Sequence, residues 1–381
     1  MKKIESFTGM RFIMIMVVVL AHFYFLSTFD AFGPFYKRFL NNPIFAVDFF
    51  FLLSGFGMML SFLNRNECDL EVPNFLYCMN YGINHIKKIY PVYLATIILG
   101  ISIKFINSIF NSEFNFDFIK HEAVKIVVNI PLLQSATGML FFTHAYNPVS
   151  WFLSCLFIIY IVSPLLMYFL IKTSKSIKYD IFLILLNAVI ILGLAHVFEK
   201  IELAFDNIKG IPDVNALHYS SPYHRVFYVL IGMNLAMIFW KVKDKKDFFS
   251  EKVINILEIL TSFIVIIYFF IRNSLPDTSL YYKYLIDVFL CSLFVFVLAF
   301  DNGPVSKLLK KSKMQFLGNI SMYIFLIHFP LIMFLGSLVE KYYSWTPLLS
   351  VAFMFFILIF TFFISIVIYK ANIKKVGKNN G

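Results

Sequence analysis

Long apolar stretches separated by short polar segments follow one another along the whole chain. Ten of them are long enough to cross about 30 Å of hydrocarbon as helices. They lie near 11–28, 43–63, 89–108, 150–171, 179–198, 222–240, 253–271, 281–300, 315–337 and 347–369. The pattern predicts an all-α polytopic membrane bundle of about ten transmembrane helices. We expect one integral-membrane domain over 1–381, with a short basic tail from about residue 370.

Composition supports a membrane protein and excludes an ordinary soluble domain. The 381 residues are 60% hydrophobic and 19% aromatic, and such a chain cannot cover its surface with polar groups. The formal net charge is +11, but the basic residues are spread over separate connections. A compact basic groove for nucleic acid is therefore not expected. The four cysteines are scattered, so neither a disulfide nor a metal site is predicted.

The basic residues predict the orientation of the bundle. An even number of spans puts both termini on one side. Without Arg11 and Arg225, the connections on that side hold 21 lysines and arginines, against 10 on the other side. Because cytoplasmic loops carry the excess of basic residues, both termini are predicted to be cytoplasmic. Lys2 and Lys3 precede an apolar run, but no small-residue cleavage site follows, so we expect a retained first helix.

One connection on the outer side is unusually long, from about Ile109 to Val149. Its apolar part, Val124 to Leu140, contains Pro131 and several polar residues. This composition suits a re-entrant or interface-lying segment better than an eleventh span.

Two polar residues in the first apolar stretch are the strongest functional signal. Arg11 and His22 are eleven residues apart, which places them within about 20° of the same helix face and about 16 Å apart along the axis. Both groups are costly in hydrocarbon, so a cavity filled with water or ligand is expected beside them. The alternative is a snorkelling arginine at the interface and a histidine hydrogen-bonded between helices.

Other polar residues are expected at a similar depth. His328 lies thirteen residues into the ninth span, Asp48 lies in the second span, and Arg225 begins the sixth. These three could join the same cavity, or each could simply be hydrogen-bonded to a neighbouring helix. Histidine is suited to general-base catalysis because its usual pKa leaves it largely neutral. No nucleophile elbow, HExxH helix or P-loop occurs in the sequence.

Several segments together resemble the integral-membrane acyltransferase family 3. Arg11 and His22 match its first-helix pattern, and Val47 to Phe56 resembles its VDxFFxxSGF helix. Lys88 to Tyr93 is similar to its RIxPxY segment, and Asn147 to Ser154 resembles its WxLS motif. Leu317 to Pro330 resembles its LGxISxxxYLxHxP motif.

The chain departs from the family pattern at three places. His85 and Lys88 stand where the family has two arginines, and Leu156 replaces a glutamate after the WxLS serine. Phe325 replaces a tyrosine before the LxH sequence, so a hydroxyl is missing.

The resemblance implies an O-acyltransferase, most simply an O-acetyltransferase, in a bacterial cytoplasmic membrane. The donor would be cytoplasmic acetyl-CoA or another acyl-CoA, and the acceptor a hydroxyl of a cell-surface or lipid-linked glycan. His22 would be the general base or a transient acyl carrier. Arg11, His85 and Lys88 would bind the donor. Asp48, Trp151, Arg225 and His328 would orient the acceptor or support His22. The oligomeric state is left open.

A transporter or flippase for a glycan or anionic substrate is the alternative, because intramembrane arginine and histidine could line a translocation path. The sequence lacks the paired, broken short helices typical of many transporters.

Overall fold

The fold is a bundle of helices, as predicted. The computed structural model describes residues 4–65, 71–206, 216–244, 250–275 and 280–379, and no strand occurs in these ranges. The main helices are α1 (Glu5–Ala21), α3 (Pro43–Leu63), α4 (Phe75–Ile86), α5 (Tyr90–Phe110), α6 (Phe116–Asn129), α8 (Trp151–Thr173), α9 (Ile177–Asp206), α11 (Pro222–Val242), α12 (Glu251–Ile271), α13 (Leu280–Leu298), α15 (Ser312–Tyr342) and α16 (Pro347–Asn379). Short helical turns connect them: α2 (Gly33–Phe35), α7 (Leu140–Thr143), α10 (Leu217–Ser220) and α14 (Pro304–Leu309).

Eight helices in the described part of the chain are long and apolar enough to cross a membrane. They coincide with eight of the ten predicted spans. The other two predicted spans coincide with α1, of 17 residues, and α13, of 19 residues. Proline stands at the start of α3, α11 and α16, where the missing N–H costs no hydrogen bond.

The first span differs from the prediction at its end. We expected a helix through residue 28, but α1 ends at Ala21, and His22 is its C-cap. The backbone N–H groups of His22 and Phe23 donate to residues three positions back, which tightens the last turn. The Tyr36 hydroxyl donates to the Ala21 carbonyl and so satisfies a group that a longer helix would have used. His22 therefore lies at a helix end, not within a helix.

Small residues set the closest helix contacts. A Cβ atom at Gly55 of α3 would lie 2.0 Å from the Val229 carbonyl oxygen of α11, and one at Gly232 of α11 would lie equally close to the Leu52 carbonyl oxygen. Gly318 of α15 meets the Thr8 carbonyl of α1 in the same way. These contacts bring the helix backbones together, as is typical of membrane bundles.

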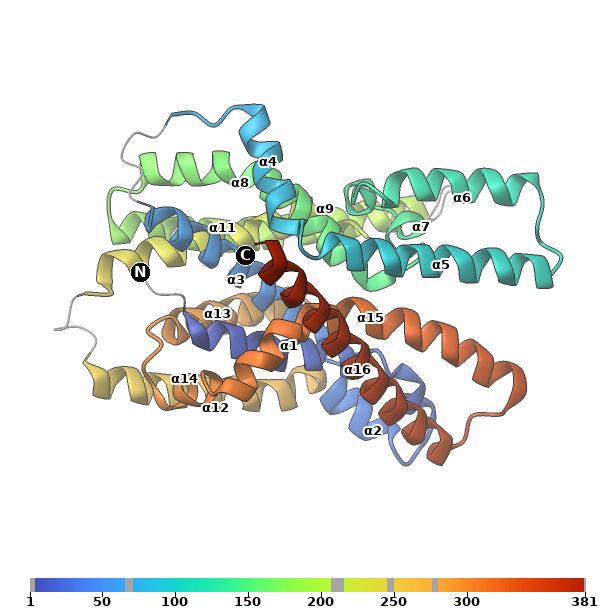
Figure 1. Ribbon diagram of the computed structural model, residues 1–381. Helices are drawn as coiled ribbons and strands as arrows, with labels where there is room; N and C mark the ends of the chain where they lie inside the picture. The colour runs from blue at the N-terminus through green and yellow to red at the C-terminus, as the bar shows by residue number, and fades with distance from the viewer. Residues whose placement is uncertain (1–3, 66–70, 207–215, 245–249, 276–279, 380–381) are drawn as a thin grey trace.

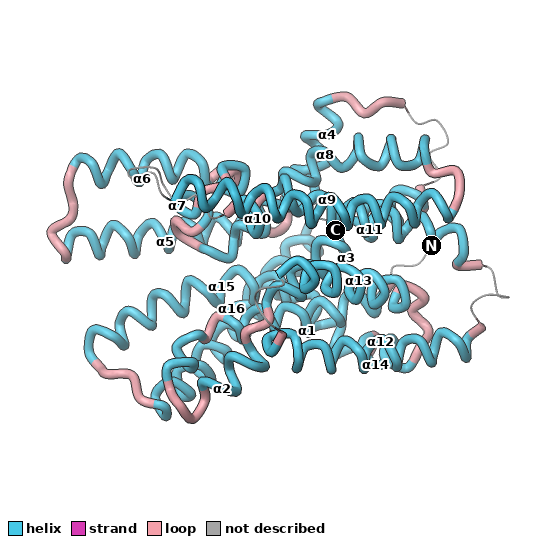
Figure 2. Tube along the Cα trace, turned by 180° about the vertical axis from the view of Figure 1, so that it is seen from behind, coloured by secondary structure: helices cyan, strands magenta, loops and turns pink. Residues whose placement is uncertain are grey.

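The two ends of the bundle are distinct (Figure 1). The start of α1, the end of α11 and the start of α12 lie at one end, which we call the N-terminal end. The connections between α5 and α6 and between α15 and α16 extend from the opposite end, and the view from behind shows the same separation (Figure 2). Segments predicted to lie on opposite sides of the membrane thus lie at opposite ends.

The long connection forms an arm and a broken helical segment. The helix α6 ends at Asn129, just before Pro131, and a short 3₁₀ turn, Gln134–Thr137, and α7 follow. The apolar segment around Pro131 is therefore not a continuous span in the structure.

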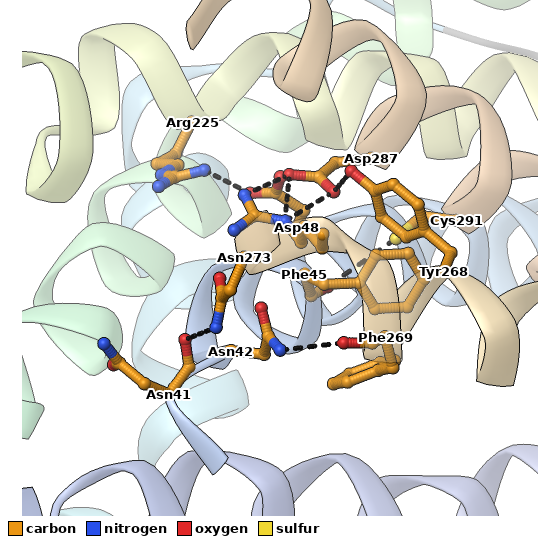
Figure 3. A network of polar contacts seen from close by, with 11 residues as sticks. Asn41, Asn42, Phe45, Asp48, Arg225, Tyr268, Phe269, Asn273, Asp287 and Cys291 are labelled. Atoms are coloured by element: carbon orange, nitrogen blue, oxygen red, sulfur yellow. Dashed lines mark hydrogen bonds and ion pairs between the residues drawn. The ribbon is translucent and has the colours of Figure 1, made fainter. Parts of the chain in front are cut away.

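Two buried ion pairs tie the central helices together (Figure 3). Asp48 of α3 accepts a hydrogen bond from Arg225 of α11, and both side chains are fully buried. Beside them, Asp287 of α13 accepts three hydrogen bonds from Arg272, at 2.6, 3.0 and 3.2 Å, and one from the Tyr268 hydroxyl at 2.7 Å. Each buried charge thus has an opposite charge as partner, as the low dielectric of the interior requires.

We expect Asp48→Asn to destabilise the bundle by about 3–5 kcal/mol, because it leaves the buried Arg225 guanidinium without a counter-charge. The thermal midpoint of the purified protein in detergent measures the loss. Asp180→Asn is the matched control, since its partner Lys241 is a quarter exposed and can turn toward water. An equal midpoint shift for the two variants would contradict this account of the ion pair.

The predicted orientation can be tested with exposed residues at the two ends of the bundle. Cysteine at Lys175, between α8 and α9, should react with a membrane-impermeant maleimide only after cell lysis. Cysteine at Glu113, between α5 and α6, should react in intact cells. The parent protein, with its four native cysteines, gives the background. The reverse pattern would place the termini outside.

Candidate active site

Two histidines from different helices meet in the middle of the bundle. His22 lies at the end of α1, and His328 lies in α15, where it is fully buried. The Nδ1 atom of His22 and the Nε2 atom of His328 are 3.1 Å apart. The structure thus brings together the two histidines that the sequence places at similar depth.

The partners of these rings define which nitrogen carries the proton. The Nδ1 atom of His328 lies 3.1 Å from the Ile324 carbonyl oxygen, which can only accept. In neutral His328, Nδ1 therefore bears the hydrogen and Nε2 accepts. It follows that His22 donates from its Nδ1, so that the Nε2 atom of His22 keeps a free lone pair. A lone pair of this kind can accept a proton or attack a carbonyl carbon.

A proline links this pair to the start of α8. Pro330 has no N–H, so the Leu326 carbonyl, four residues earlier, lacks its usual helical donor. The Asn147 side chain donates to that carbonyl at 3.0 Å and also contacts the Thr96 hydroxyl at 3.0 Å. Asn147 belongs to the segment that leads into Trp151. Two motifs far apart in the sequence are thus joined by one hydrogen bond beside His328.

His22 lines a cavity of about 200 Å³ in the half of the bundle away from the N-terminal end. Its other lining residues include His144, Trp151, Tyr219, Phe325 and Phe329. Aromatic rings therefore form much of the cavity wall around His22 and His144. Phe325 contributes only a ring here, because the hydroxyl of the family's tyrosine is missing.

Arg11 lines a separate cavity of about 360 Å³ nearer the N-terminal end. Its walls include His85, Ser54, Tyr160, Asn319 and Ser321. Arg11 is exposed, and among the described residues no carboxylate lies within ion-pair distance of it. The His85 ring lies between Tyr81 and Tyr160, with centroid distances of 4.1 and 4.8 Å. Phe152 lines both this cavity and that of His22, so the two cavities are neighbours.

The remaining predicted site residues are divided between the cavity walls and the surface. Trp151 lines the His22 cavity, whereas Lys88 is exposed beside α5 and lines neither cavity. Asp48 and Arg225 do not line the His22 cavity. Arg225 instead contacts its wall from behind, with its guanidinium 6.0 Å from the Trp151 ring and 5.1 Å from that of Tyr219.

Sequence reasoning missed two features of this region. His144 lies in the broken connection after α7, and neither a span nor a motif marked it as functional. The Arg272–Asp287 pair was also missed, although a carboxylate inside an otherwise apolar span was a usable signal for it.

Comparison of the chain with protein-family models identifies its family. The family model of the acyltransferase domain of acyltransferase family 3 matches residues 4–370. No curated protein and no solved structure matches the chain. The match extends over nearly every described helix and includes the Arg11 and His22 cavities. The chain therefore belongs to acyltransferase family 3, and it is a multi-pass membrane acyltransferase.

Proposed function

We propose that this protein is an O-acetyltransferase of a bacterial cytoplasmic membrane. It takes the acetyl group of cytoplasmic acetyl-CoA and transfers it to a hydroxyl of a cell-surface or lipid-linked glycan. The observation that carries the proposal is the arrangement of Arg11 and His22. One helix presents a cation to one cavity and a reactive imidazole nitrogen to the next, and the two cavities share Phe152.

The Arg11 cavity suits the donor. Acetyl-CoA has an anionic nucleotide end and a long, thin arm that ends in the thioester. An unpaired guanidinium attracts phosphate and can bind it through two hydrogen bonds. His85 lines the same cavity, and its Nδ1 donates to the Tyr81 carbonyl at 2.8 Å, so a cationic His85 would donate to a phosphate from its Nε2. Lys88, outside the cavity, would meet the nucleotide end only at the rim.

The distance between the two groups fits the length of the donor. Arg11 and His22 are eleven residues apart on α1, which corresponds to about 16 Å along the helix. An extended pantetheine arm can cover this distance while the phosphates stay at Arg11. The thioester would then arrive at the Nε2 atom of His22, past Phe152.

The His22 cavity suits a sugar. Its volume of about 200 Å³ can hold one ring, and the aromatic faces of Trp151 and Tyr219 offer flat apolar contacts for the C–H face of a sugar. The acceptor would enter from the end opposite to the donor. The acyl group alone then crosses between the two sides, and the cofactor stays in place.

We expect His22→Gln to abolish transfer, because an amide can keep the hydrogen bond to His328 but can neither attack the thioester nor take a proton. Loss of such a group typically lowers the rate about 10²–10⁴-fold. The measurement is the release of free thiol from acetyl-CoA by isolated membranes, followed with 5,5'-dithiobis(nitrobenzoate). A transporter would release no thiol in either form.

Arg11→Ala provides the complementary variant. It should raise the KM for acetyl-CoA with a smaller change in kcat, because Arg11 holds the nucleotide end and not the reacting atoms. Arg11→Lys should restore the KM only in part, since lysine cannot form a bidentate phosphate contact.

Near wild-type transfer by His22→Gln at matched expression would reject the proposed function.

A further inference from the structure

The His22 cavity contains a second imidazole that the proposed function does not use. His144 lies just after α7, in the connection between the α5–α6 arm and α8 (Figure 1). It lines the same cavity as His22. His144 follows α7, which lies toward the end of the bundle opposite the N-terminal end (Figure 1), and this is the end from which the acceptor would enter.

The backbone around His144 is held on both sides. Asn129 donates its side-chain amide to the Phe142 carbonyl at 3.1 Å, two residues before His144. Asn147, three residues after it, donates to the Leu326 carbonyl next to His328. The backbone that carries His144 is therefore linked to α6 on one side and to α15 on the other. A fixed position of this kind is what a group acting on a substrate requires.

The partner of His144 also defines its protonation. The Thr143 hydroxyl donates to the Met139 carbonyl at 3.2 Å, so its oxygen can accept from the Nδ1 atom of His144, 3.1 Å away. The Nε2 atom of neutral His144 then keeps a free lone pair. His144 is an exposed residue that lines the cavity, and partial desolvation of its ring lowers its pKa below the usual histidine value. The ring is therefore neutral and able to accept a proton.

A second base is needed if His22 carries the acyl group. The Nε2 atom of acylated His22 has no lone pair left, so it cannot take the proton of the attacking hydroxyl. His328 cannot take the proton of the hydroxyl either. It is fully buried and is not among the described residues that line this cavity. Among the described residues of the cavity wall, His144 is the other imidazole.

We propose that His144 is the general base for the acceptor hydroxyl and that transfer proceeds through an acyl group on His22. This inference rests on the proposed function and deepens it. It divides the reaction between two imidazoles: His22 acts on the donor, and His144 acts on the acceptor.

In the first step, the Nε2 atom of His22 bonds to the thioester carbon and the C–S bond breaks. The thiolate takes a proton from water in the Arg11 cavity. The Nδ1 proton of His22 passes to the Nε2 atom of His328 across their 3.1 Å hydrogen bond, which leaves a neutral acyl-imidazole.

In the second step, the acceptor oxygen bonds to the acyl carbon while its proton moves to the Nε2 atom of His144. The C–N bond breaks, and His22 recovers its Nδ1 proton from His328. His144 then gives its proton to water on the acceptor side. The sum is thioester plus alcohol to ester plus thiol, with one proton taken up from water on the donor side and one proton released to water on the acceptor side.

The test separates the two steps. Purified His144→Gln mixed rapidly with acetyl-CoA, without acceptor, should release about one thiol per protein at the wild-type rate. In isolated membranes, which hold the native acceptor, the same variant should form base-labile acetyl ester from labelled acetyl-CoA about 10²–10⁴-fold more slowly than wild type. Added imidazole should partly restore ester formation by His144→Ala, because a free base can occupy the space.

His121→Gln is the matched control, since His121 lies on the nearby helix α6 and lines neither cavity. It should keep both the burst and ester formation. Wild-type ester formation by His144→Gln would overturn the role of His144, and so would loss of its burst. Absence of a burst in the wild-type protein would overturn the acyl-His22 route. If His22→Gln transfers normally, it is the proposed function that fails.

Discussion

The hydrogen bond between His22 and His328 is the interaction on which the account of this protein depends. It fixes the proton on the Nδ1 atom of His22 and so leaves the Nε2 atom free. The bond requires that α1 end at Ala21, because a helix that continued through His22 would give its ring other surroundings. It also requires that α15 hold His328 at the same depth as His22. The hydrogen bond from Asn147 to the Leu326 carbonyl, which has no helical donor because of Pro330, joins that part of α15 to the start of α8.

The buried ion pairs and Arg11 have different roles in the bundle. Asp48, Arg225, Arg272 and Asp287 are buried in pairs, where each charge has an opposite partner. These pairs hold the central helices and, through Arg225, the aromatic wall formed by Trp151 and Tyr219. Arg11, by contrast, lines a cavity and can contact a ligand there. In a buried pair each charge is neutralised by its partner within the protein. A cation that lines a cavity is instead stabilised when an anion binds to it.

Much of the fold follows from the sequence, because hydrocarbon admits little other than continuous apolar helices. The second predicted span, 43–63, has the same bounds as α3. The end of the first helix could not be predicted, since it depends on the Tyr36 hydroxyl, which reaches Ala21 only in the folded chain. The meeting of His22 and His328 was expected from their depth. The place of His144 in the cavity was not expected. It depends on hydrogen bonds from the Asn129 and Asn147 side chains that form only in the folded chain.

The tautomer of His22 decides whether its Nε2 atom is free to react. Solid-state nitrogen NMR of the ¹⁵N-histidine-labelled protein in bilayers distinguishes a protonated ring nitrogen from one with a lone pair, and the spectrum of His22→Gln identifies the His22 signals. We expect Nδ1 of His22 to be protonated and Nε2 not, and we expect His328→Phe to abolish this preference. A proton on the Nε2 atom of His22 in the wild-type protein would contradict this prediction.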